Sequence, residues 1–220
     1  MSNPNPLIIS FLAIRRAIGF LGILLPAVLL LGTLTIGRCT HVQESVSHYY
    51  YTIMGDVLVG ILCAVSLFLL CYKGYDLNDR VSSLLAGVFA LGIAFFAASQ
   101  NTDAQCSLFD LEPNRVRIAI HFISATLFFI TLSYISLFLF TKSSGLKTER
   151  KKTRNRLYRT CGVIMIAAIG LIALIKFIPS LDSFLAPYKP VFWLEWIALA
   201  AFGTSWLVKG KFMLTDKEEQ

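Results

Sequence analysis

Charged residues are scarce in this chain of 220 residues, of which 15% are charged and 56% are hydrophobic. About a quarter of the residues in a typical soluble domain are charged, so this shortage excludes an ordinary soluble enzyme. Low-complexity tracts are also lacking, and the 17 phenylalanines exclude a disordered or fibrous chain. The composition therefore indicates an integral membrane protein.

Histidine and cysteine are few as well, with three and five residues. The sequence has no His-x-x-x-His, Glu-x-x-His or Cys-x-x-Cys pair and no phosphate-binding glycine loop. Only His121 falls inside a predicted span, which excludes a bis-histidine haem. The cofactor is therefore left unknown, and a divalent metal such as zinc is the one candidate.

Six apolar runs are long enough to cross roughly 30 Å of hydrocarbon as helices. They predict an all-α fold, a polytopic transmembrane six-helix bundle. The connections are too short for a soluble domain, so residues 1–220 form one domain. The predicted spans cover about residues 17–36, 54–72, 82–98, 118–141, 160–178 and 191–208.

Lysine and arginine are distributed unequally between the connections, with 15 of the 20 on the side of the two termini. Because cytoplasmic connections carry the excess of basic residues, both termini are predicted to be cytoplasmic, in the cell (inner) membrane. The basic segment 142–159 lies beside apolar spans, so it indicates topology and contact with anionic headgroups rather than nucleic acid. The expected partners are membrane lipids, and a homo-oligomer is left open.

Small and aromatic residues suggest how the helices are placed. The alanines at 86, 90, 94 and 98 are four residues apart and predict a closely packed helix face. The tyrosines at 49–51 and the tryptophans at 193 and 196 predict an aromatic belt at the outer interface.

Three ionisable residues lie just inside predicted spans that begin at the outer face: Asp56, His121 and Glu195. Each lies roughly 3 to 6 Å below the outer boundary at 1.5 Å per residue. Charged side chains in lipid are costly, so these three are candidates for a common functional pocket. The three side chains are enough to bind a divalent metal ion and leave one coordination position for water. Alternatively, they can serve as the general acid and base that hydrolyse a lipid. A purely structural polar cluster is the alternative.

Other polar side chains surround this predicted pocket. Ser124 and Arg117 share a helix face with His121, so Ser124 is a candidate nucleophile and Arg117 a candidate anion-binding residue. Ser47 and His48 precede Asp56 in the outer connection and are candidate binding residues. Arg117 can instead pair with Asp56 or Glu195, and Ser47 can instead cap a helix.

Cys39 and Cys106 both fall in outer connections. An oxidising compartment permits a disulfide between them, and free thiols are the alternative.

Four short motifs stand out in the sequence: Ser45–Thr52 before Asp56, Tyr72–Asp76, His121–Ala125 and Phe192–Glu195. They resemble those of a family of uncharacterised bacterial six-helix membrane proteins, similar in outline to the DRAM/FRAG/Sfk group. That resemblance covers nearly the whole chain and implies a membrane location and a role in lipid handling and membrane homeostasis.

A more distant resemblance is to the membrane hydrolases that include alkaline ceramidases and progestin–adiponectin receptors. These proteins hold zinc with three His, one Asp and one Ser, and Asp56, His121 and Ser124 match only part of that set. Here there are six predicted spans rather than seven, and the last has no paired histidines.

Three functions are therefore open. The first is recognition of a lipid or amphiphile through an outer-leaflet polar pocket lined by Asp56, His121 and Glu195. The second is a metal-dependent lipid hydrolase that uses the same residues. The third is a small transporter or permease, which the lack of a detectable inverted repeat disfavours. Whether the protein is an enzyme is left open by the sequence.

Overall fold

The computed structural model is all-α and describes residues 6–37, 39–74, 76–98, 106–109, 111–112, 114–142 and 148–214. Three short segments accompany the α-helices: the 3-10 helices η1 (Val46–Tyr51) and η3 (Ala186–Tyr188), and the π-helical turn η2 (Ile135–Leu139). The α-helices in the described residues are α1 (Pro6–Thr35), α2 (Gly55–Cys71), α3 (Leu77–Phe95), α4 (Arg115–Tyr134), α5 (Glu149–Phe177), α6 (Pro179–Leu185) and α7 (Pro190–Lys209).

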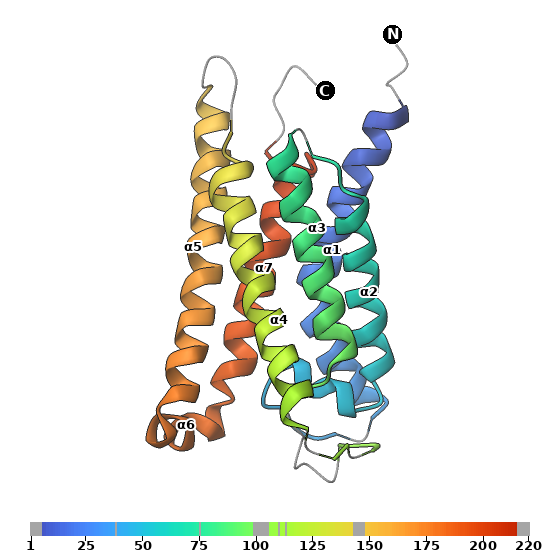
Figure 1. Ribbon diagram of the computed structural model, residues 1–220, viewed down its shortest axis with the longest axis vertical. Helices are drawn as coiled ribbons and strands as arrows, with labels where there is room; N and C mark the ends of the chain where they lie inside the picture. Colours follow the sequence, from blue (N-terminus) through green and yellow to red (C-terminus); the bar gives the residue numbers. More distant parts are fainter. Residues whose placement is uncertain are drawn as a thin grey trace.

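Six of these helices pack as a closed ring. Going around it, α1 contacts α2, α2 contacts α3, α3 contacts α4, α4 contacts α5, α5 contacts α7, and α7 returns to α1. Figure 1 shows the chain entering and leaving at the same end of the bundle, called here the terminal end. The opposite end, called the loop end, carries η1 and α6.

Five described helices are long and apolar enough to cross a membrane, so the protein is a multi-pass helical membrane protein. They are α1, α3, α4 with η2, α5 and α7. Helix α2 is apolar too but has only 17 residues, which is at the lower limit for a span.

Several helices begin before the predicted spans, because hydropathy marks the apolar part of a helix and not its termini. Helix α5 begins at Glu149 rather than near residue 160, since Thr148 caps it by accepting from the Lys151 amide. Helix α3 begins at Leu77, where Asp76 accepts from the Asp79 amide. Much of the basic segment 142–159 is therefore helical. Helix α6 is too short to give a hydropathy signal and was not predicted.

The alanine face of α3 is confirmed as closely packed. Ala86, Ala90 and Ala94 are at most 1% exposed, and α3 lies between α2 and α4. Ala98 is buried too but lies beyond the end of α3 at Phe95. The hydroxyl of Ser66 on α2 donates to the Gly87 carbonyl at 2.8 Å, which requires close approach of the two backbones.

The predicted aromatic belt was wrong for two of its tyrosines. Tyr49 and Tyr51 are fully buried in the loop end rather than placed at an interface. The Tyr49 ring packs against Phe192 of α7, and the Tyr51 hydroxyl donates to the Ala98 carbonyl at 2.9 Å. Their burial makes η1 part of the folded core at this end.

Candidate functional site

The short helix η1 is the centre of the polar contacts at the loop end. Ser45 caps it, because its hydroxyl accepts from the His48 amide at 3.2 Å and lies 2.6 Å from His48 Nδ1. Thr52 follows its last residue and donates to the Tyr49 carbonyl at 2.8 Å. These side-chain bonds satisfy the backbone groups that a short helix leaves unpaired.

Glu195 ties η1 to α7. Its Oε2 accepts from the Val46 amide at 2.6 Å, at the first residue of η1. The Phe192 amide, one turn earlier on α7, donates to the Glu44 carbonyl at 3.1 Å. The Glu195 carboxylate is therefore used to hold the backbone of the outer connection, which favours the structural role that the sequence left open.

His121 ties η1 to α3 and α4. Its Nδ1 lies 2.7 Å from the Phe96 carbonyl and its Nε2 lies 3.1 Å from Ser47 Oγ. A carbonyl only accepts, so Nδ1 carries the proton, and in the neutral ring Nε2 accepts from the Ser47 hydroxyl. The ring is 3% exposed and both nitrogens are engaged. The cavity beside it measures about 10 Å³, which has room for one water and no larger ligand.

Asp56 lies apart from these contacts. It is exposed in the first turn of α2 and lines a separate groove. Within the described residues, no three His, Cys, Asp or Glu side chains lie close enough to hold a metal ion. The structure thus does not assemble Asp56, His121 and Glu195 into the common pocket or metal site that their equal depth suggested.

The groove beside Asp56, called here the Asp56 groove, has a volume of about 460 Å³ between the loop-end halves of α2 and α3. This volume is within the range of small-molecule sites. Its walls are mostly apolar, and Phe95 and Leu108 are more than 60% exposed at its rim. The lining residues are Tyr50, Thr52, Ile53, Gly55, Asp56, Val59, Gly60, Ala94, Phe95, Leu108 and Phe109.

Most of these walls were not predicted from the sequence. Gly60 lies one turn after Asp56, and a methyl group placed on it would meet no atom within 4 Å, so the groove continues along α2. Phe109 reaches the groove from the second outer connection, and its ring contacts the Tyr50 ring. The one sequence signal for this wall of the Asp56 groove is the aromatic residue Phe109 inside an otherwise polar connection.

The remaining candidates have other surroundings. Ser124 is buried and packs directly against Gly92 of α3, where a side chain on residue 92 would not fit. With both nitrogens of His121 already engaged, no described base is placed to activate Ser124 as a nucleophile. Arg117 donates from Nη2 to the Glu112 carbonyl at 3.2 Å, and no ion pair links it to Asp56 or Glu195 in the part of the chain described.

The two outer cysteines meet at the loop end. Cys39 and Cys106 form a disulfide with a Cα–Cα distance of 5.2 Å, and both are buried. Two residues after Cys106, the Leu108 amide donates to the Tyr51 carbonyl at 2.8 Å. The disulfide and this hydrogen bond together fix Leu108 and Phe109 as a wall of the Asp56 groove.

His48 is the titratable group of η1. Burial lowers the pKa of its imidazole from 6.5 to about 4. The Glu44 carboxylate opposes this shift, while the charges of Lys176 and Lys189 add to it. The ring is therefore neutral near pH 7.

Acidification is expected to destabilise the protein through His48 between pH 6.5 and about 4. In this window the unfolded chain binds a proton that the folded chain does not, so the stabilisation present above pH 6.5 is lost as the pH falls. The loss is on the order of 1 to 2 kcal/mol, because partial exposure reduces the full effect. Unfolding midpoints measured against pH should fall more steeply for wild type than for His48→Gln. If the unfolding midpoints of wild type and His48→Gln fell equally with pH, a group other than His48 would cause the pH dependence.

No protein family, curated protein or solved structure matches this chain. The resemblances drawn from its sequence motifs therefore stay predictions, and the function is argued from the geometry.

Proposed function

We propose that this multi-pass membrane protein binds an amphiphile with a cationic headgroup in the Asp56 groove. The observation that carries the proposal is the Asp56 carboxylate, which has no ion pair or hydrogen bond to any described residue. It lies in a groove whose walls are mostly apolar. A carboxylate beside apolar walls attracts a cation that carries its own hydrocarbon.

The aromatic walls support a cation rather than a neutral headgroup. Tyr50, Phe95 and Phe109 all line the groove, and the Tyr50 and Phe109 rings meet edge to face, 5.9 Å apart. The faces of aromatic rings attract ammonium groups, and quaternary ammonium is commonly bound by several rings together. An amine or quaternary ammonium group therefore fits this groove better than a phosphate alone.

The open side of the groove supports an amphiphile rather than a water-soluble cation. Gly60 leaves space along α2 below Asp56, toward the middle of the bundle. An alkyl chain can follow this space while its headgroup stays at the level of Asp56. The sequence-based proposal of lipid recognition thus keeps Asp56 but replaces His121 and Glu195 with aromatic residues.

The proposal goes with six membrane spans, of which α2 is the shortest. The bundle then lies in the inner membrane of the cell, with both termini in the cytoplasm. The supporting observations are the common end of the two termini in Figure 1 and the excess of basic residues at that end. In this orientation the Asp56 groove opens to the outer leaflet. The proposed lipid-handling role is also the one that the DRAM/FRAG/Sfk resemblance implies.

Binding of dodecyltrimethylammonium to purified protein in dodecyl maltoside micelles tests the proposal. Wild type is expected to bind this cationic amphiphile, and Asp56→Asn to bind it about tenfold more weakly, as expected from loss of one partly desolvated charge pair. Because Asp56 is exposed and has no described partner, the variant should fold as wild type does. Isothermal titration gives both affinities.

Glu112→Gln is the matched control, since Glu112 is an exposed acid in the second outer connection and does not line the groove. It should bind like wild type. Equal loss of affinity in Asp56→Asn and Glu112→Gln would show that net charge, and not a site at Asp56, determines binding. Equal affinity of wild type and Asp56→Asn would remove the proposed site.

A further inference from the structure

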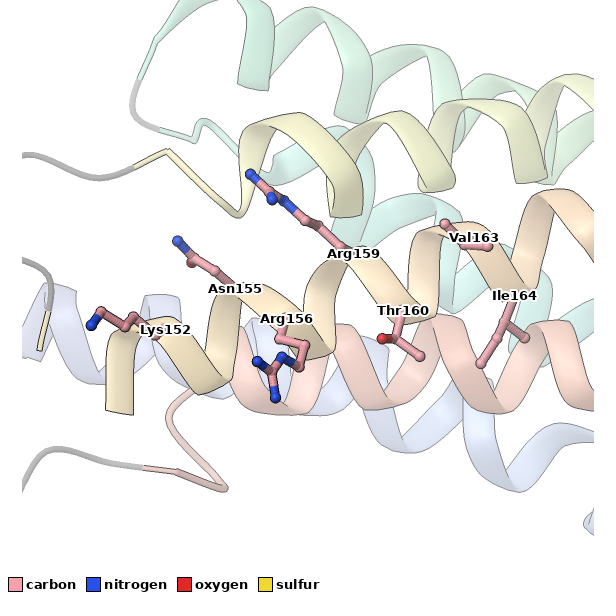
Figure 2. A pocket seen from close by; sticks show the side chains of 7 residues that line it. All are labelled: Lys152, Asn155, Arg156, Arg159, Thr160, Val163 and Ile164. Atoms are coloured by element: carbon pink, nitrogen blue, oxygen red, sulfur yellow. The ribbon is translucent and has the colours of Figure 1, made fainter. Parts of the chain in front are cut away.

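A second surface, at the terminal end, has the opposite charge. It lies on one face of α5, whose residues follow one another at spacings of three and four and so share one side of the helix. Figure 2 shows them along the first half of the helix. They line a cavity of about 530 Å³. The α5 stripe consists of Lys152, Asn155, Arg156, Arg159, Thr160, Val163 and Ile164.

The stripe changes from charged to apolar along the helix. Its basic residues come first, Thr160 follows, and Val163 and Ile164 lie further along (Figure 2). Helix α5 has 29 residues, about 44 Å at 1.5 Å per residue, so it exceeds the roughly 30 Å of hydrocarbon. Its first turns therefore lie at the level of the headgroups, while Val163, 59% exposed, faces acyl chains.

Two arginines of the stripe have no charge partner among the described residues. Arg156 and Arg159 are exposed and make no hydrogen bond or ion pair with any described residue. The nearest acid on the helix, Glu149, pairs instead with Lys152 at 2.7 Å. Like charges three residues apart on one helix face destabilise the helix, and an anion bound by both arginines would remove this repulsion. In Figure 2 the two guanidinium groups extend in opposite directions, so both exposed side chains would turn toward a shared anion.

We propose that the α5 stripe binds an anionic phospholipid of the leaflet at the terminal end. Arg156 and Arg159 bind the phosphate, since the planar guanidinium donates two parallel hydrogen bonds to phosphate oxygens. The Thr160 hydroxyl, one residue deeper, can donate to an ester carbonyl of the lipid. Val163 and Ile164 contact the acyl chain.

The order of the stripe favours a lipid over a soluble phosphate. A free phosphate uses only the arginines and gains nothing from exposed Val163 and partly buried Ile164, one turn deeper. A phospholipid presents phosphate, ester and hydrocarbon in the same sequence as the cations, hydroxyl and aliphatic side chains of α5. This charge and polarity match is the reason to choose a phospholipid as the occupant.

Native mass spectrometry of the full chain released from nanodiscs tests this site. The nanodiscs contain equal amounts of phosphatidylglycerol and phosphatidylcholine of the same chain length. Wild type should retain phosphatidylglycerol in preference to phosphatidylcholine. Arg156→Gln/Arg159→Gln should reduce retained phosphatidylglycerol at least about tenfold, as expected from the loss of two basic contacts to an anionic headgroup.

Lys73→Gln/Arg80→Gln is the matched control, because both residues are exposed at the same end of the bundle and lie outside the stripe. It removes the same charge and should change retention less than about twofold. Equal loss in the two double variants, or equal retention of both lipids by wild type, would overturn the proposal. Displacement of the lipid by excess soluble glycerol phosphate would also overturn it, since a chain-free phosphate would then occupy the site as well.

Discussion

Replacing Cys39 and Cys106 by alanine is expected to lower the free energy of unfolding by about 3 to 4 kcal/mol. The disulfide joins residues separated by 67 positions, so its loss restores much freedom to the unfolded chain. It also frees the segment that carries Leu108 and Phe109 into the Asp56 groove. Affinity for dodecyltrimethylammonium should therefore fall together with stability. Chemical unfolding in mixed micelles and isothermal titration measure the two effects.

Cys63→Ala/Cys71→Ala is the control for this experiment, since both residues are free cysteines of α2. It removes the same number of cysteines without breaking the disulfide and should leave the groove intact. Wild type treated with a reductant should behave like Cys39→Ala/Cys106→Ala. Identical unfolding curves with and without the reductant would show that the bond contributes nothing to stability.

Replacing Glu195 by alanine is expected to cost about 2 to 3 kcal/mol of unfolding free energy, the usual value of a hydrogen bond to a charged group. The Val46 amide loses its acceptor, and the segment 44–46 then loses one of its hydrogen bonds to α7. The second attachment, from the Phe192 amide to the Glu44 carbonyl, stays in place. The protein should therefore still fold, with a lower unfolding midpoint in mixed micelles.

Glu195→Gln is the informative companion, because its amide oxygen can still accept from Val46 while the charge is removed. It should recover more than half of the stability lost in Glu195→Ala. If Glu195 instead served a metal or a substrate, Glu195→Gln would be as impaired in ligand binding as Glu195→Ala, while both kept the stability of wild type. That pattern would contradict the structural role assigned here.

The depths of the polar residues were predictable, but their directions were not. Asp56, His121 and Glu195 each follow a helix start at the loop end, as their sequence positions indicated. Position along a helix fixes depth, at 1.5 Å per residue. The direction of a side chain around the helix depends on how that helix is rotated against its neighbours. Asp56 thus faces the groove between α2 and α3, while His121 and Glu195 reach η1.

The roles of the tyrosines show the same limit. Their amphipathic rings are common at membrane interfaces, so a belt was the natural prediction. In the structure the connection before α2 folds inward as η1, and Tyr49 and Tyr51 become fully buried. Hydropathy cannot detect this, because the inward path depends on Glu195, His121 and Cys106, all distant in sequence.

By itself, the sequence determined that the chain is helical and lies in a membrane, since long apolar runs in lipid must satisfy their backbone groups internally. The alanine spacing of α3 also determined its buried face, because small side chains allow helices to approach closely. Only the tertiary structure decided which polar groups meet. Contacts between distant segments, and the rotation of each helix in the ring, left Asp56 beside aromatic walls and committed His121 and Glu195 to holding η1.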